Sequence, residues 1–391
     1  MGAVRDDGTA ALRPLIVLGA TGSIGRQTLE VARSLRMEVW GLAAARGSDA
    51  LLALAGAHPE AVVVVATPAG EERRRFEVVL GGRVRFGPEA VADLAATPGS
   101  IVLNGVVGAA GLAASVAALE AGNRLALANK ESLVAGGPVV EAARRRGGGE
   151  LLPVDSEHSA LLQCLVGENP ASIRRIVLSA SGGPFRGRAL AELEGVTVAD
   201  ALAHPTWRMG RRITIDSATL MNKAFEVIEA HCLFGVPYDR IAVVVHPQSV
   251  VHSLVEFADG SVKAQLGPPD MRIPIQYALT YPERLPGVVP PFDPTSRSLT
   301  FEPPDLDAFP CLRLGYEAGR AGGSAPAVLN AADEVAVRAF LEGRIGFTSI
   351  PAVVERALEA VPQRSLASVA DVLEADAAAR AAASAALGTS C

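Results

Sequence analysis

The feature that most constrains the fold of this chain is a glycine-rich turn between a short apolar run and a helical stretch. Residues 15–18 are apolar, and residues 19–25 read Gly-Ala-Thr-Gly-Ser-Ile-Gly. Apolar side chains then recur at helical spacing through residues 24–35, and residues 38–43 form a second apolar run. This order predicts a β-α-β unit that opens a parallel sheet.

The turn favours dinucleotide binding, because its glycines let backbone N–H groups at a helix N-terminus approach a pyrophosphate. Its spacing is GxxGxxG rather than GxGxxG, and a plain strand-to-helix connection is the alternative. At the end of the second strand, Arg46 and Ser48 suit a ribose phosphate and favour NADP over NAD. Arg46 can equally be a surface loop residue, and Asp49 lies close by in the sequence.

The alternation of strands and helices continues and predicts an α/β fold whose first domain spans residues 1–154. Because strands and helices alternate, this domain is predicted to be a Rossmann-type, doubly wound parallel sheet, and the turn at residues 19–25 makes it the expected NADPH-binding domain. Its further predicted elements are strands at 61–66, 101–104, 124–128 and 151–154 and a helix at 111–121.

After residue 154, the regular alternation of strands and helices gives way to a mixed arrangement of the two. Residues 155–288 are predicted to form a second α/β domain, catalytic, with an open mixed sheet, because strands at 250–257 and 261–266 flank a hairpin-type turn. Prolines are frequent around the predicted linker 289–311, and residues 312–391 are predicted to form a small C-terminal helical bundle. The other predicted strands are 175–179 and 241–245, and the predicted C-terminal helices are 312–319, 325–343, 349–360 and 369–386.

Composition excludes several classes of partner. The chain of 391 residues has 36 Lys plus Arg against 42 Asp plus Glu, and no dense basic run with aromatics would attract nucleic acid. No stretch is apolar and long enough for a signal peptide or a membrane span. The cysteines lie far apart, as reduced thiols do, so a cytoplasmic protein is expected. They are Cys164, Cys232, Cys311 and Cys391.

A carboxylate pair follows the strand predicted at residues 151–154. Asp155 and Glu157 are two residues apart, and on an extended chain such side chains point to the same side, where both can bind one hard cation. The alternative is that Asp155 or Ser156 caps a helix over 159–165. From these residues alone, neither interpretation is favoured.

A second polar segment suits a phosphate. Ser217 is a good N-cap, and Asn222 and Glu226 share a helix face four residues apart. The hydroxyl, the amide, the ammonium of Lys223 and the helix terminus favour an anion, and Glu226 can supply a third metal carboxylate. Taken alone, a solvated helix with a Lys223–Glu226 pair is the better interpretation.

Two loops complete the candidate residues. Ser181 stands beside two glycines in a turn that can bring N–H groups onto phosphate oxygens, although such turns are often only structural. The segment His204-Pro-Thr-Trp207-Arg-Met209-Gly210 has the character of a mobile lid that shields a reaction from water, or else of ordinary loop packing. His246 and His252 are assigned no catalytic role.

Taken together, these motifs resemble the 1-deoxy-D-xylulose 5-phosphate reductoisomerase family along nearly the whole chain. The motifs, in the family's order, are GATGSIG, Ala128-Asn-Lys130-Glu-Ser132, PVDSEH, SASGGPF, HPTWRMG, DSATLMNKAFE and HPQSVVHS. The resemblance implies an NADPH-dependent isomerisation and reduction that yields 2-C-methyl-D-erythritol 4-phosphate in non-mevalonate isoprenoid synthesis. It further implies a sugar phosphate substrate, a divalent metal (magnesium, manganese or cobalt) and a homodimer formed through the middle domain.

The resemblance also assigns roles to residues of this chain. The implied metal ligands are Asp155, Glu157 and Glu226, and the implied catalytic residues are these three with Lys130 and His204. The implied substrate contacts are Lys130, Ser156, Glu157, Ser181, His204, Trp207, Ser217, Asn222, Lys223 and Glu226. The implied cofactor contacts are Gly19, Thr21, Gly22, Ser23, Ile24, Arg46, Gly47, Asn129, Glu131, Met209 and Gly210.

Two positions depart from the family's pattern. Ala45, Arg46 and Gly47 stand where a glycine and an asparagine are common near the ribose phosphate, so the cofactor class is better supported than the preference for NADPH. Asp333 stands where an asparagine is usual, and we interpret it as structural and away from the chemistry. The rival functions are a dehydrogenase of the homoserine or semialdehyde type, which needs no three-carboxylate metal site, and a non-catalytic NADP-binding sensor.

Overall fold

The computed structural model describes residues 12–207 and 209–388, and the chain folds into two compact units. Unit 1 comprises Met1–Asn129, Val140–Asp155 and Met271–Pro290, and unit 2 comprises Lys130–Val139, Ser156–Asp270 and Pro291–Cys391. The division into domains at residues 154, 288 and 311 stays a prediction. Parts of its first and last domains, with Cys391, and Arg208 of the predicted lid lie outside the described residues.

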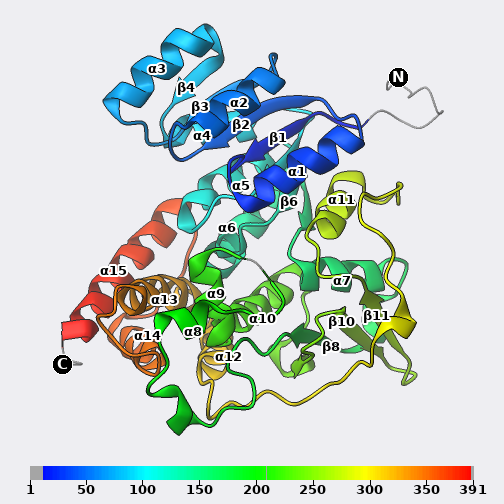
Figure 1. The fold of residues 1–391 in the computed structure, drawn as a ribbon, viewed down its shortest axis with the longest axis vertical. Helices are drawn as coiled ribbons and strands as arrows, with labels where there is room; N and C mark the ends of the chain where they lie inside the picture. The colour runs from blue at the N-terminus through cyan, green and yellow to red at the C-terminus, as the bar shows by residue number, and fades with distance from the viewer. Residues whose placement is uncertain (1–11, 208, 389–391) are drawn as a thin grey trace. The chain divides into compact units, whose positions relative to one another are not determined.

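Unit 1 contains a parallel sheet of seven strands in the order β4-β3-β2-β1-β5-β6-β7, which confirms the doubly wound fold (Figure 1). All four residues of β1 are buried, which is why its apolar run does not alternate with polar residues. The strand order reverses between β1 and β5, and such a switch point is where open α/β sheets bind ligands. The strands are β1 Leu15–Leu18, β2 Val39–Ala44, β3 Val62–Val65, β4 Val84–Phe86, β5 Ile101–Asn104, β6 Arg124–Leu127 and β7 Glu150–Pro153.

Helices of unit 1 lie along this sheet, with α1 packed against α11 and α4 against α5 (Figure 1). They are α1 Ser23–Ser34, α2 Asp49–Ala57, α3 Gly70–Leu80, α4 Pro88–Ala95, α5 Leu112–Glu120 and α11 Arg272–Thr280, with short 3-10 turns at Gly81–Arg83 and Ala109–Gly111. The helix α6, Lys130–Gly147, begins in unit 2 and ends in unit 1.

Unit 2 contains a mixed sheet of four strands in the order β11-β10-β8-β9. β10 is antiparallel to β8 and β11, whereas β8 is parallel to β9, so the predicted hairpin and the open mixed sheet are confirmed. The helix α7, Ser156–Leu165, packs on β10 and β11. The strands are β8 Ile173–Ala180, β9 Ile241–Val245, β10 Val251–Phe257 and β11 Val262–Leu266.

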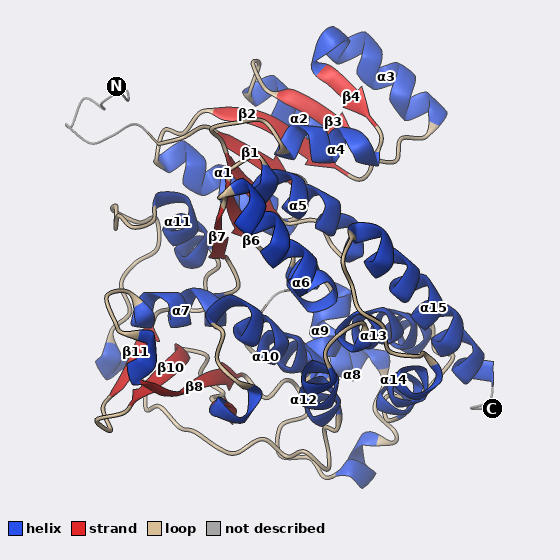
Figure 2. Ribbon diagram, turned by 180° about the vertical axis from the view of Figure 1, so that it is seen from behind, coloured by secondary structure: helices blue, strands red, loops and turns tan. Residues whose placement is uncertain are grey.

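The C-terminal helices of unit 2 form the predicted bundle, in which α13 packs against α14 and α15 (Figure 2). One hydrophobic core runs from Leu178 of β8 through Phe225 of α10 to Val354 of α14. The helices are α8 Val198–Leu202, α9 Arg211–Ala218, α10 Met221–Phe234, α12 Cys311–Ala321, α13 Ala325–Leu341, α14 Ser349–Ala360 and α15 Val369–Gly388, with 3-10 turns at Pro170–Ser172, Leu190–Leu193, Tyr238–Arg240 and Pro294–Ser296. Among residues 12–207 and 209–388, none of the helices has the length and apolar character needed to span a bilayer.

Candidate active site

The glycine-rich turn of unit 1 is closely packed backbone. Gly19 has a φ of +81°, and a Cβ there would lie 2.6 Å from the carbonyl oxygen of Gly105, in the loop after β5. A Cβ at Gly25 would lie 2.3 Å from the carbonyl oxygen of Gly19. Gly22 is the N-cap of α1 and is exposed with Ser23. The turn therefore needs glycine at positions 19 and 25, and it presents the N-terminus of α1 to solvent, where an anion can bind.

Asn129, a predicted cofactor contact, is buried in unit 1 and holds the loop that follows β5. Its Nδ2 donates to the carbonyl oxygens of Val106, at 2.8 Å, and Gly108, at 3.0 Å. Since Gly105 of this loop also meets Gly19, the amide supports the wall of the dinucleotide turn. The sequence alone did not indicate this role.

Arg46, predicted to bind the ribose phosphate, is exposed and paired with Glu72 of α3. Its Nη2 lies 2.8 Å from Glu72 Oε1, and the N–H of Gly47 donates to Glu72 Oε2 at 3.3 Å. The Arg46 guanidinium holds the pKa of Glu72 well below its usual range. Ser48 caps α2 by accepting from the N–H of Leu51. A phosphate at Arg46 would therefore compete with the Glu72 carboxylate.

The three predicted metal ligands converge. Asp155, Glu157 and Glu226 each offer a carboxylate oxygen, and these oxygens all lie within 4.8 Å of one another. The prediction that Asp155 and Glu157 converge because they lie on an extended chain is wrong. The helix α7 begins at Ser156, so Glu157 lies in its first turn. Three carboxylate oxygens at this spacing suit a hard divalent cation.

Two lysines lie against Glu226, which is only 1% exposed. Lys223 Nζ contacts Glu226 Oε2 and lies 3.5 Å from Glu157 Oε1, while Lys130 Nζ lies 3.5 Å from Glu226 Oε1. Asn222 joins the group, since its Nδ2 donates to Glu226 and its Oδ1 accepts from Lys130. Buried carboxylates require such compensating charges, and this set leaves a cluster able to bind both a cation and an anionic substrate.

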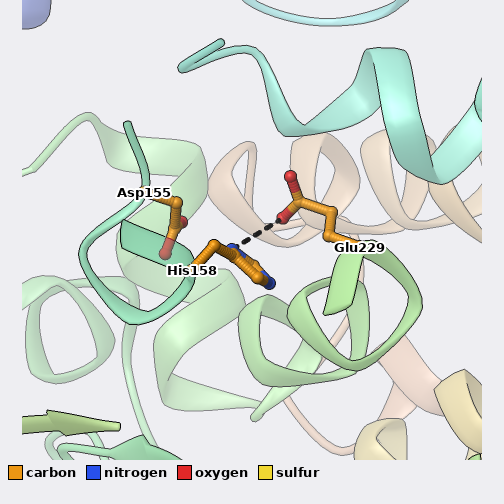
Figure 3. A group of neighbouring side chains, drawn as sticks. All are labelled: Asp155, His158 and Glu229. Carbon is orange, nitrogen blue, oxygen red and sulfur yellow. Dashed lines mark ion pairs between the residues drawn. The ribbon is translucent and has the colours of Figure 1, made fainter. Parts of the chain in front are cut away.

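A second cluster lies beside the first and was missed by the sequence interpretation. Asp155, His158 and Glu229 also offer ligand atoms within 4.8 Å of one another (Figure 3). His158 Nε2 lies 2.9 Å from the carbonyl oxygen of Glu226, and its Nδ1 lies 3.9 Å from Glu229 Oε2. The available signal was the spacing of Glu226 and Glu229, three residues apart on one helix face.

The predicted phosphate residues lie on three adjoining segments. Ser181 follows β8, and the turn continues through Gly183, whose Cβ would lie 2.8 Å from the carbonyl oxygen of Ser217. Asn222 and Lys223 lie in the first turn of α10, a helix of 14 residues. This arrangement gathers two hydroxyls, an amide and an ammonium near a helix N-terminus.

The prediction that Ser217 is an N-cap is wrong. Ser217 lies inside α9, and the N-cap of α10 is Leu220, which has the left-handed φ of +61°. The N–H of Leu220 donates to the carbonyl oxygen of Ser217 at 3.3 Å, so a tight turn joins the two helices. A left-handed leucine is strained, and such strain is often found at functional sites.

The predicted lid places His204 against Ser181. His204 Nδ1 accepts from the N–H groups of Thr206, at 3.1 Å, and Trp207, at 2.9 Å. Its Nε2 must therefore carry the proton of a neutral ring and donate to Ser181 Oγ, 3.0 Å away. Burial lowers the pKa of His204, which favours this neutral form.

The remaining lid residues are placed as follows. The ring of Trp207 lies 6.4 Å from that of His252, measured between centroids. Met209 is partly buried, and Gly210 is the exposed N-cap of α9.

Asp333 forms an ion pair with Arg212. Arg212 of α9 lies 3.0 Å from Glu131 Oε1 and 3.5 Å from Asp333 Oδ2, so one guanidinium joins Asp333 to a predicted cofactor contact. Asp333 is therefore one guanidinium away from a predicted cofactor contact, and its interpretation as structural and away from the chemistry stays a prediction.

Three family models match the chain. One is described as 1-deoxy-D-xylulose 5-phosphate reductoisomerase and matches residues 15–137. Another, its C-terminal domain, matches residues 151–234, and a DXP reductoisomerase C-terminal domain matches residues 266–382.

Curated relatives and solved structures carry the same name. The reductoisomerase of Heliobacterium modesticaldum is 52% identical over 94% of this chain and 96% of its own length, and that of Pelotomaculum thermopropionicum is 50% identical over 93% and 96%. The Zymomonas mobilis enzyme in complex with NADPH superposes with a TM-score of 0.90 at 42% identity, covering 96% of this chain and 99% of that one. A reductoisomerase in complex with NADPH, fosmidomycin and magnesium gives a TM-score of 0.89 at 38% identity, covering 96% and 98%. This chain therefore belongs to the 1-deoxy-D-xylulose 5-phosphate reductoisomerase family.

Proposed function

We propose that this chain converts 1-deoxy-D-xylulose 5-phosphate to 2-C-methyl-D-erythritol 4-phosphate, using NADPH and a divalent cation. The observation that carries the proposal is the convergence of Asp155, Glu157 and Glu226 beside two buried lysines. A cation held by these carboxylates supplies Lewis acidity toward vicinal hydroxyl and carbonyl oxygens of the substrate. Neither a semialdehyde dehydrogenase nor an NADP sensor needs this cluster.

The chain's own side chains bind and orient the sugar phosphate. Lys130 Nζ and Ser156 Oγ donate to its hydroxyl oxygens. The neutral His204 donates through Nε2 and, with Trp207, closes over the substrate and excludes water. The phosphate is bound by Ser181, Ser217, Asn222 and Lys223.

The hydride comes from NADPH held in the turn of unit 1, with Thr21, Gly22, Ser23 and Ile24 at its pyrophosphate. On cofactor binding, the Arg46 guanidinium leaves its ion pair with Glu72 and pairs with the ribose phosphate instead. Gly47 lies beside this phosphate. Asn129, Glu131, Met209 and Gly210 contact the nicotinamide half. The solved relatives with bound NADPH support this choice of cofactor.

One assay tests the proposal. Oxidation of NADPH is followed with 1-deoxy-D-xylulose 5-phosphate, with and without a chelator, and with NADH as comparison. We expect turnover that stops on chelation, returns with magnesium or manganese, and is far slower with NADH. Turnover that survives chelation, or reduction of a semialdehyde instead, overturns the proposal.

We further propose a homodimer that forms through strand β11. This strand is an edge of the four-stranded sheet, pairs with β10 alone among the described strands, and exposes Val262. At the opposite edge, the last residue of β9, Val245, forms a bridge with Glu302. Exposed edges of this kind pair readily with another chain.

Replacing Val262 by aspartate tests the dimer. We expect Val262→Asp to sediment as a monomer at micromolar concentration, because it puts a charge on the pairing edge. Val79→Asp is the matched control, since Val79 of α3 is 58% exposed against 56% for Val262 and lies in unit 1. A Val262→Asp protein that remains dimeric contradicts this interface.

We also propose that the enzyme works in the cytoplasm. Among the described residues, Cys164 and Cys311 are buried thiols outside any disulfide, as is usual in a reducing compartment.

A further inference from the structure

Arg212 is the centre of an ion-pair cluster that joins three helices of unit 2. Its Nη1 donates to Glu334 Oε1 of α13, at 2.7 Å, and to Glu131 Oε1 in the first turn of α6, at 3.0 Å. Its Nη2 donates to Asn330 Oδ1 at 2.9 Å. The guanidinium thus holds the start of α9 against α6 and α13.

Two further carboxyl groups lie against this guanidinium, and both are buried. Asp216 is 4% exposed and Asp333 is fully buried. Their nearest oxygens lie 3.6 Å from Arg212 Nε and 3.5 Å from Arg212 Nη2, respectively. Within the described part of the chain, neither oxygen of Asp333 nor Oδ1 of Asp216 accepts a hydrogen bond. Buried carboxylates without donors are costly, which points to a proton.

The charges around the pair argue for the same proton. Arg212 already faces Glu131 and Glu334, so with both aspartates ionised it would face four carboxylates. Two adjacent buried carboxyls avoid this repulsion when one is protonated and donates to the other. The other charged and titratable groups around the pair are Lys130 of α6, Cys311 of α12, and Arg380 of α15, which pairs with Glu334 and Asp376.

We propose that Asp216 and Asp333 share one proton, held by Asp333, and that this neutral acid keeps Arg212 free to position Glu131 and the first turn of α9 for NADPH. Ionised Asp333 would compete with Glu131 for the guanidinium. Asp333 and Arg212 are thus positioning residues, since they act through Glu131 and through Gly210, two residues before Arg212. The NADPH role rests on the proposed function, whereas the shared proton does not.

The expected protonation agrees with the surroundings of each group. Burial, followed by the charge of Asp216, raises the pKa of Asp333 well above its ordinary value. Burial also raises the pKa of Asp216, to about 6, against the opposing effect of Arg212. Both shifts favour a protonated carboxyl in the folded protein.

The first test compares wild type with Asp333→Asn, whose amide has the size of the acid and can still donate to Asp216. Folding raises the pKa of Asp333, so the folded protein keeps a proton that the unfolded chain releases near 3.8. The stability of wild type relative to Asp333→Asn is therefore greatest below this pH. It falls as pH rises toward the folded pKa, by up to about tenfold in the unfolding equilibrium constant per pH unit.

Denaturant unfolding between pH 4 and pH 8 on the whole chain measures this difference. Glu355→Gln is the control, because it removes one exposed carboxylate from α14, and its curve should parallel that of wild type. Parallel curves for wild type and Asp333→Asn would overturn the shared proton. If Asp333→Asn folds poorly, infrared spectra of wild type and Asp216→Asn test the shared proton instead. Folded wild type at neutral pH should show the carbonyl stretch of a protonated carboxyl, and Asp216→Asn should lose it because Asp333 then ionises against Arg212.

The positioning role is tested by titrating NADPH against both proteins across the same pH range. We expect the dissociation constant of wild type to rise once Asp333 ionises, by up to about tenfold per pH unit, while that of Asp333→Asn stays nearly constant. Equal pH profiles would overturn the positioning role even if the proton is confirmed. Unfolding and infrared readouts need no substrate, so their failure is distinct from failure of the proposed function.

Discussion

Glu226→Gln is expected to abolish turnover, by roughly 10³-fold or more, on the scale of losing a principal electrostatic group in an active site. Glutamine keeps the size of the side chain but removes the charge that binds a cation. It also leaves Lys130 and Lys223 without their shared carboxylate, which is destabilising because both ammoniums are buried. NADPH affinity should remain nearly intact, because Glu226 is not among the proposed cofactor contacts and the glycine-rich turn lies in unit 1.

Steady-state kinetics with added magnesium and fluorescence titration with NADPH measure the two effects separately. Glu317→Gln is the matched control, since Glu317 is exposed on α12 and pairs with Arg313, and it should behave as wild type. Near-normal activity of Glu226→Gln in magnesium would show that the metal assignment is wrong.

Gly25→Ala is expected to have the converse effect, with NADPH binding weakened more than tenfold. The new Cβ would lie 2.3 Å from the carbonyl oxygen of Gly19 and 2.7 Å from the α-carbon of Ala20, and backbone cannot yield as a side chain can. Overpacking of this kind costs about 1–3 kcal/mol of stability and moves the turn away from the pyrophosphate. The substitution leaves the three metal-cluster carboxylates, Asp155, Glu157 and Glu226, unchanged.

Gly56→Ala provides the control for Gly25→Ala. Gly56 lies in α2 and a Cβ there meets no atom within 4 Å, so alanine should stabilise the protein by about 0.4–1 kcal/mol. Thermal unfolding and NADPH titration compare the two. A Gly25→Ala protein with unchanged NADPH affinity would remove the turn from the cofactor site.

Much of the fold could be predicted because buried parallel strands consist of consecutive apolar residues, which are visible in the sequence. The strands predicted at residues 101–104 and 241–245 have the same bounds in the structure, and the β10–β11 hairpin follows from its turn. The helix α3 is not predicted, because it is rich in Glu and Arg and buries only Phe76 and Leu80, which leaves little helical periodicity. Strand β4, three residues long, carries too short a pattern to detect.

The candidate site was predictable in its residue types but not in its geometry. The sequence rules predict Glu157 on an extended strand and Ser217 at a helix N-cap. In the structure, both residues lie within helices. The tautomer of His204 depends on two backbone N–H groups of its own loop. The environment of Asp333 comes from helices far apart in sequence. Local patterns contain none of this, because these contacts arise only when distant segments pack together.

The continuous core of unit 2 has a consequence for how the enzyme responds to its ligands. Phe225, which lies next to the candidate ligand Glu226, belongs to the same apolar core as Val354. Any ligand that binds only the folded form stabilises every element whose opening disrupts that form. Substrate and cation should therefore slow amide exchange in α14 as well as in α10, so that α14 reports occupancy of a site to which it contributes none of the candidate residues.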